Sequence, residues 1–103
     1  MALNLKSFAF SATASAAPLS ATDLWVAQFS INNLAGGADP AYIGDSAVTS
    51  AAGYPIVVGS NFAIDAAMNP STVMKRINLK NIYIICAATK TASLRVTYIE
   101  DVL

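Results

Sequence analysis

The sequence predicts an all-β protein: one small antiparallel β-sandwich, jelly-roll-like, or a barrel, with an N-terminal arm. Three observations indicate this fold. Apolar residues alternate with a period of two, turn clusters recur at short intervals, and 103 residues are the length of a single domain. We therefore take residues 1–103 as one domain, in which residues 1–20 form a docking arm or an edge strand.

The first strand is expected at Leu3–Phe10, where the apolar phase slips between Leu5 and Phe8. A bulge near Lys6, or a change of partner strand, explains such a slip. The stretch Phe8–Ala17 is small and apolar, but hydroxyl residues interrupt it, and a secretion signal needs a continuous apolar core. We therefore expect an N-terminal arm that docks on its own domain or on a neighbour.

The most regular strand is expected at residues 25–32, where Trp25, Phe29 and Ile31 share the face that enters the core. Shorter strands are expected at Ala41–Gly44 and Phe62–Asp65. Between these strands lie clusters of glycine, proline, asparagine and aspartate, which are the residues that form turns.

The last two strands are expected at Asn81–Ala88 and Leu94–Ile99. Asn81–Ala88 is apolar on both faces, which predicts a central strand that is covered on both sides. Ala88–Ser93 is predicted to be the hairpin connection between these two strands. A single helical turn is predicted at Ser71–Ile77, with Ser71 as its cap.

The composition indicates a protein that associates with other chains. Hydrophobic residues make up 55% of the chain and charged residues 12%, with six basic and six acidic side chains. A typical domain is about 25% charged. A folded domain of this size still exposes about a third of the surface that its unfolded chain would expose. Zero net charge also removes the repulsion that keeps small proteins apart. We therefore expect an assembly subunit, with no basic surplus for nucleic acid and no apolar run long enough for a membrane span.

The residue types argue against enzymatic chemistry. There is no histidine to act as a general base, and a single cysteine excludes an intrachain disulfide and a thiolate zinc site. Cys86 lies in an apolar strand and is expected in the core. The aspartates near turns, Asp39, Asp45 and Asp65, match no calcium loop and are expected to bond their own backbone. A serine–lysine pair is the one nucleophilic arrangement left open, and no cofactor or metal is expected.

Several exposed segments are candidates for contact with another protein. Tyr54, within a Gly-Tyr-Pro turn, is the better aromatic candidate. A basic group at residues 75–80 is opposite in sign to the acidic pair at residues 100–101, which fits either solvated loops or patches that orient adjoining subunits. The contact regions are expected at residues 1–10, Tyr54 and residues 68–74. The candidate interface residues are Leu3, Leu5, Phe8, Tyr54, Met68, Met74, Lys75 and Arg76.

One segment carries a resemblance. Ala41–Thr49 reads Ala-Tyr-Ile-Gly-Asp-Ser-Ala-Val-Thr and is followed by Gly-Tyr-Pro-Ile at Gly53–Ile56. It resembles small virion proteins of tailed bacteriophages, in which an Ile-Tyr-x-Ile-x-Ala strand and an Arg-Val-x-Tyr strand follow, here Ile82–Ala87 and Arg95–Tyr98. The likeness spans roughly the last two-thirds of the chain, after Asn33. It implies a β-sandwich of the capsid decoration (cement) type, or a head or tail accessory protein of similar build, and it brings no catalytic residue.

The sequence thus predicts a structural virion protein on the capsid surface, made in the host cytoplasm. It would bind the major capsid protein and stabilise the shell through oligomeric, largely apolar contacts, as a trimer or dimer. One alternative is a carbohydrate- or receptor-binding module on the virion surface, with Tyr54, Asn61 and Asp45 forming a shallow site. The sequence also leaves open a head–tail accessory protein, a subunit of a non-viral fibre or shell, and a hydrolytic enzyme, which the missing histidine disfavours.

Overall fold

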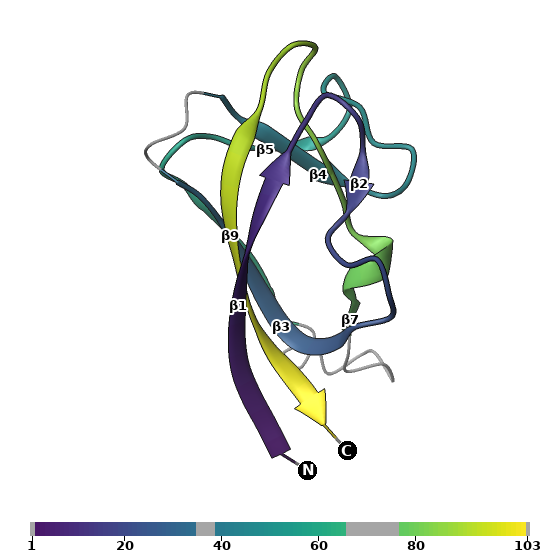
Figure 1. Ribbon diagram of the computed structural model, residues 1–103, viewed down its shortest axis with the longest axis vertical. Helices are drawn as coiled ribbons and strands as arrows, with labels where there is room; N and C mark the ends of the chain where they lie inside the picture. The colour runs from purple at the N-terminus through teal and green to yellow at the C-terminus, as the bar shows by residue number, and fades with distance from the viewer. Residues whose placement is uncertain (1, 35–38, 66–76, 103) are drawn as a thin grey trace.

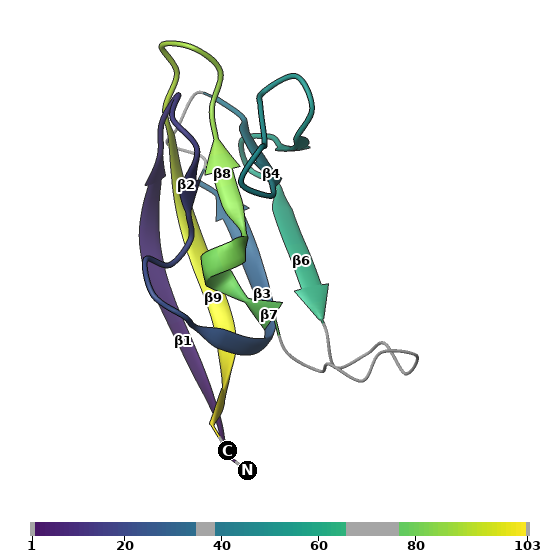
Figure 2. The same ribbon diagram turned by 90° about the vertical axis from the view of Figure 1, so that its right-hand side faces the viewer.

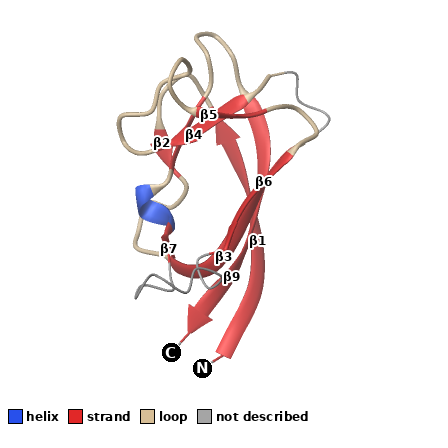
Figure 3. Cartoon of the chain, turned by 180° about the vertical axis from the view of Figure 1, so that it is seen from behind, coloured by secondary structure: helices blue, strands red, loops and turns tan. Residues whose placement is uncertain are grey.

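The computed structural model describes residues 2–34, 39–65 and 77–102, and within these it is all-β (Figure 1). Two antiparallel sheets pack together, so the predicted fold is confirmed and takes the sandwich form rather than the barrel. One short 3₁₀ turn, η2 (Leu79–Asn81), is the helical element of the described residues (Figure 3). The strands are β1 Ala2–Ala12, β2 Ala17–Pro18, β3 Trp25–Asn33, β4 Ala41–Gly44, β5 Tyr54–Ile56, β6 Asn61–Asp65, β7 Ile77–Asn78, β8 Tyr83–Ile85 and β9 Ala92–Val102.

The larger sheet has the strand order β1-β9-β3-β6, with β7 also paired to β3, and the smaller sheet has the order β2-β8-β4-β5. Every pairing is antiparallel. The first and last long strands pair along their whole length, from Ala2 opposite Val102 to Ala12 opposite Ala92. The two ends of the chain therefore lie side by side, at the tip of a β1–β9 ribbon that extends beyond the rest of the sandwich (Figures 1 and 2).

The core lies between the two sheets. In β9, Leu94, Val96 and Tyr98 are buried in alternation, which confirms the predicted period of two. The strand predicted at Asn81–Ala88 is shorter, because η2 takes its first residue and β8 covers only Tyr83–Ile85. The predicted central position is confirmed, because β8 lies between β2 and β4. Ile84 is fully buried, whereas Tyr83 and Ile85 are half-buried, so the second face is covered only in part.

The connection between β8 and β9 corrects another prediction. It is not a hairpin, because β8 pairs with β2 and β4 whereas β9 pairs with β1 and β3. Residues 86–91 instead carry the chain from the smaller sheet to the larger one. Thr89 has a φ of 64°, a left-handed conformation that non-glycine residues rarely adopt outside tight turns.

The predicted core face of β3 is half right. Phe29 and Ile31 are buried, but so is Val26, while Trp25 is only half-buried. The register with β9 shifts between Val26 and Gln28, and a bulge at this point moves the following side chains to the other face. The alternation that placed Trp25 beside Phe29 therefore breaks at the bulge.

The phase slip in β1 has a different cause from the predicted bulge. The β1–β9 register runs without interruption through Lys6, so no bulge lies there. Phe8 and Phe10 pack against the core, whereas Leu5 lies on the opposite face and is 73% exposed. The first half of β1 belongs to the ribbon that extends past the core, and its inner face therefore has no core to enter (Figure 1).

Candidate functional site

The outer face of the larger sheet is the candidate contact surface. Because residues directly opposite each other share a face of a sheet, Leu5, Ile99 and Gln28 form one row across β1, β9 and β3. Above this row the face carries small, hydroxyl or amide side chains and one arginine. These residues are Ser7, Ala9, Ser11, Ser30, Asn32, Asn61, Ala63, Ser93, Arg95 and Thr97.

Few of the described side chains on this outer face are charged. Among the residues whose side chains the structure describes, Arg95 is its one charged member. Lys6 and Glu100 lie on the other face, where Nζ and Oε1 are 3.0 Å apart. The hydrogen bond from Lys6 to Glu100 and the negative charge of Glu100 raise the pKa of the Lys6 amine. The ribbon thus pairs these two charges with each other and leaves the outer face free for contact.

A shallow groove of about 230 Å³ lies on this face. Its lining has no charged side chain within the described part of the chain, and it joins the apolar Leu5 and Ile99 to hydroxyl groups of the neighbouring strands. Such a lining fits an apolar side chain of another protein better than a charged ligand. The outer-face residues that line it are Leu5, Gln28, Ser30, Ala63, Thr97 and Ile99.

Tyr54 is exposed, as the sequence predicts, but on another part of the molecule. It lies on β5, the edge of the smaller sheet opposite to β2, and is 61% exposed. Its ring centroid is 5.3 Å from that of Phe62, which is 6.4 Å from Phe29 in the core. Tyr54 therefore packs on Phe62, which in turn packs on the core residue Phe29. These contacts lie at the side of the sandwich away from β1.

The remaining candidate interface residues are only partly placed. Leu3 lies in β1 opposite Asp101. Phe8 is on the inner face, half-buried, with its ring edge-on to Tyr98 at 5.9 Å, so it anchors β1 to the core. Among the candidates whose side chains the structure describes, Leu5 is the one on the outer face, and it is not near the tyrosine of β5. Met68, Met74, Lys75 and Arg76, and the helical turn predicted at Ser71–Ile77, lie outside or mostly outside the described residues.

The segment that carries the phage resemblance forms β4, a compact loop and β5. A methyl group of Val48 fills the loop so closely that a Cβ on Gly44 or Gly53 would lie 2.8 or 2.7 Å from it. Only glycine fits at these two positions without a shift of the neighbours. Asp45 accepts a hydrogen bond from the Ala47 amide at 2.9 Å, which confirms its predicted role in the turn. The two glycines of the motif therefore allow Val48 to pack closely inside the loop.

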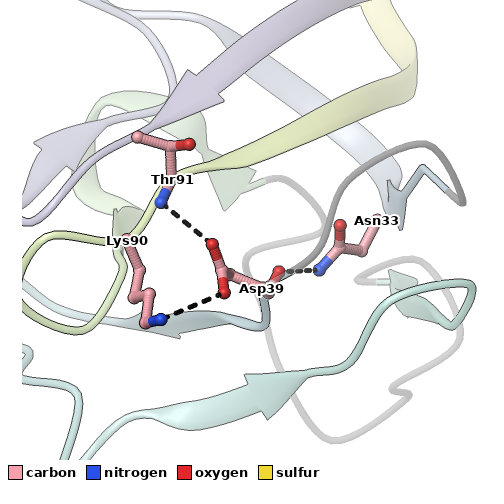
Figure 4. A network of polar contacts seen from close by, with 4 residues as sticks. All are labelled: Asn33, Asp39, Lys90 and Thr91. Carbon is pink, nitrogen blue, oxygen red and sulfur yellow. Dashed lines mark hydrogen bonds and ion pairs between the residues drawn. The ribbon is translucent and has the colours of Figure 1, made fainter.

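Asn33 is a structural residue that the sequence did not single out. It is fully buried, and its Nδ2 donates to the carbonyl oxygens of Ile56, at 2.8 Å, and Asp39, at 3.0 Å. The Asp39 carboxylate accepts from the Thr91 amide and lies 4.0 Å from the Lys90 amine, so it contacts a distant segment where the sequence predicted a bond within its own turn (Figure 4). This network ties the end of β3 to the starts of β4 and β9 and to β5. The sequence hinted at this burial only by placing Asn33 two residues after Ile31, on the side of the strand that carries the apolar residues.

The described residues hold no arrangement suited to metal binding, since no group of three or more His, Cys, Asp or Glu side chains gathers among them. Cys86 is 1% exposed, as predicted, and burial raises the pKa of its thiol. A buried neutral thiol is a poor nucleophile and a poor disulfide donor. No helix in the described ranges has the length and apolar character needed to cross a bilayer.

Comparison with known proteins shows a likeness of fold. No family model matches the chain, and no curated protein matches it. A solved structure of Bacillus endospore appendages, described as a novel family of disulfide-linked pili, superposes with a TM-score of 0.53 at 17% identity, covering 99% of this chain and 88% of that one. The chain is therefore similar in fold, over its whole length, to a protein that forms pili.

Proposed function

We propose that this protein is a structural virion protein that binds and stabilises a bacteriophage capsid shell as a decoration protein. The observation that carries the proposal is the outer face of the larger sheet, whose described side chains include one charge, Arg95, and which is grooved beside Leu5 and Ile99. A surface of this kind is suited to another protein surface. The phage-like motif in the β4–β5 loop supports the same assignment.

The mechanism is contact rather than chemistry. Removing apolar surface from water stabilises an assembly by about 25 cal/mol per Å², and a shell repeats each contact many times. A rigid sandwich keeps the cost of ordering small, because the strands are already fixed by the core. The paired charges of Lys6 and Glu100 leave little net field to repel neighbouring copies.

The fold likeness to pili favours a second candidate, a subunit of a fibre. Both candidates are repetitive assemblies of a β-sandwich, and they differ in how copies are held. A pilus with disulfide links needs accessible cysteines, whereas Cys86 is buried in the core. The fibre candidate therefore requires contacts without a disulfide from this residue.

Binding to shells tests the proposed function. Purified protein is mixed with empty heads of tailed bacteriophages, and co-sedimentation and the melting temperature of the heads are measured. We expect the protein to sediment with the heads and to raise their melting temperature. Ala63→Asp places a charge on the outer face and should weaken binding about tenfold, whereas Ala88→Asp, in the exposed β8–β9 connection, should bind as the unaltered protein does. Failure of the unaltered protein to bind, or equal binding of both variants, would contradict the proposal.

A further inference from the structure

The two sheets have very different edges. A strand at an edge exposes unpaired backbone N–H and C=O groups, and proteins protect such edges with short strands, prolines, charges or bulges. The edge strands β2 and β5 have two and three residues and contain Pro18 and Pro55, and β6 has five residues. The fourth edge, β1, has eleven residues and no proline. In Figure 2 it is the outermost strand of its sheet.

The usual protections are missing along β1. Its register with β9 runs from Ala2 to Ala12 with no bulge to twist the edge away. Lys6 is its one charged residue, and this amine is held 3.0 Å from Glu100 of the adjacent strand. The charge that would repel an incoming strand is therefore neutralised within the ribbon. A long, regular edge whose one charge is paired within the ribbon is a template for another strand.

We propose that β1 pairs antiparallel with β1 of a second copy of this chain, across a two-fold axis that passes through Ser7. Ser7 is the midpoint of Ala2–Ala12, so this register pairs all eleven residues of each strand. The partner strand should match the eleven residues of β1. Among the described strands only β9 has the same length, and it is already paired on both sides, so the matching partner is β1 of a second copy. The β6 edge could cover less than half of β1.

The side chains of β1 are self-complementary in this register. Leu5 meets Ala9 of the partner subunit, and Lys6 meets Phe8 of the partner subunit, so an exposed leucine covers a small residue and a cation lies beside a ring. Outer-face residues meet outer-face residues, because the register preserves the alternation of the strand. Two Ser7 hydroxyls face each other on the axis, and no like charges are brought together.

The dimer has one continuous sheet with the strand order β6-β3-β9-β1-β1-β9-β3-β6. Its outer surface brings the two grooves onto one sheet and doubles the outer face of the monomer. The inference concerns self-association and stands without the shell. If the chain binds shells as a monomer, the dimer is wrong and the proposed function is untouched.

Cysteine cross-linking tests the register. With Ser7→Cys in the full chain, air oxidation should give a disulfide-linked dimer, because residues opposite on antiparallel strands have Cβ atoms about 4.5–5.5 Å apart. Ser11→Cys is the matched control on the same face of the same strand. In the proposed register the two copies of position 11 are about 27 Å apart along the strands, and no cross-link should form. Cys86 is buried and does not compete.

A charge at the axis gives an independent readout. Ser7→Glu brings two carboxylates together and should weaken the dimer about fivefold, whereas Ser93→Glu, on the same face but on β9 and outside the β1–β1 pairing, should leave its dissociation constant unchanged. The unfolding midpoint of each variant, measured at low concentration, checks that both chains fold. Cross-linking at position 7 alone and weakening at position 7 alone support the dimer. Cross-linking at neither position, equal cross-linking at both, or equal weakening by both charges overturns it.

Discussion

The two faces of the larger sheet come from the same strands but carry opposite chemistry. On the inner face Phe29, Ile31 and Val96 are no more than 2% exposed, whereas on the outer face Leu5 is 73% exposed among serine, threonine and asparagine. The inner face therefore supplies the stability of the fold. The outer face contributes little to stability and is free to contact another protein.

The largest effect is expected on the inner face. Phe29→Ala removes a buried ring that packs on Phe62 and should lower the free energy of unfolding by about 3–5 kcal/mol. Ser30→Ala, one residue along on the outer face, should change it by less than about 0.5 kcal/mol. Urea unfolding of the two variants measures both values. Similar losses would remove the distinction between the faces.

The next effect concerns the buried polar network at the end of the inner face. Asn33→Leu leaves the carbonyl oxygens of Ile56 and Asp39 without their donor, and should cost about 2–4 kcal/mol of unfolding free energy. Asn32→Leu, at the exposed neighbouring position, should cost less than about 0.5 kcal/mol. Thermal or urea unfolding compares them. A tolerated Asn33→Leu would show that the network is dispensable.

The β4–β5 loop extends the contrast to the smaller sheet. Gly44→Ala places a Cβ 2.8 Å from a methyl group of Val48 and should cost about 1–3 kcal/mol. In a Val48→Ala background that methyl group is gone, so the same glycine substitution should cost less. A double-mutant cycle by urea unfolding measures the coupling. Equal costs in the two backgrounds would mean that the glycine is required for another reason.

The smallest effect on stability is expected at the groove. Leu5→Ser and Ile99→Ser should each change the free energy of unfolding by less than about 0.5 kcal/mol, because neither side chain is in the core. Both should nevertheless weaken co-sedimentation with phage heads. Stability and binding are measured on the same preparations. A large loss of stability would mean that the outer face belongs to the fold and not to a contact surface.

Local periodicity predicted the strands whose alternation is set by the core. β4 begins and ends as predicted, and the buried side of β9 follows the sequence pattern, because each strand there has one face in the interior and one outside. The pattern failed at Trp25, since a bulge changes the phase without leaving a mark in the residue types. The predicted hairpin between β8 and β9 was also wrong, because a short turn-like segment does not show whether the next strand joins the same sheet or the other one.

The candidate site was predictable in its character but not in its location. The sequence showed the low charge content and offered Leu5 and Tyr54 as contact residues, and both are exposed in the structure. Their positions on different sides of the sandwich, and the groove beside Ile99, depend on strand order and register, which are long-range properties of the fold. The buried role of Asn33 was hidden for the same reason, since its hydrogen-bond partners lie in segments beyond the strand that carries it.

The proposal that this chain is an assembly subunit is tested most directly by its mass in solution over a range of concentrations. Sedimentation equilibrium should show a species of twice the 10.7 kDa mass of one chain, dissociating as the protein is diluted. The same preparation should add to empty phage heads. A monomer at every concentration that binds no shell would contradict both the self-association through β1 and the role as a shell protein.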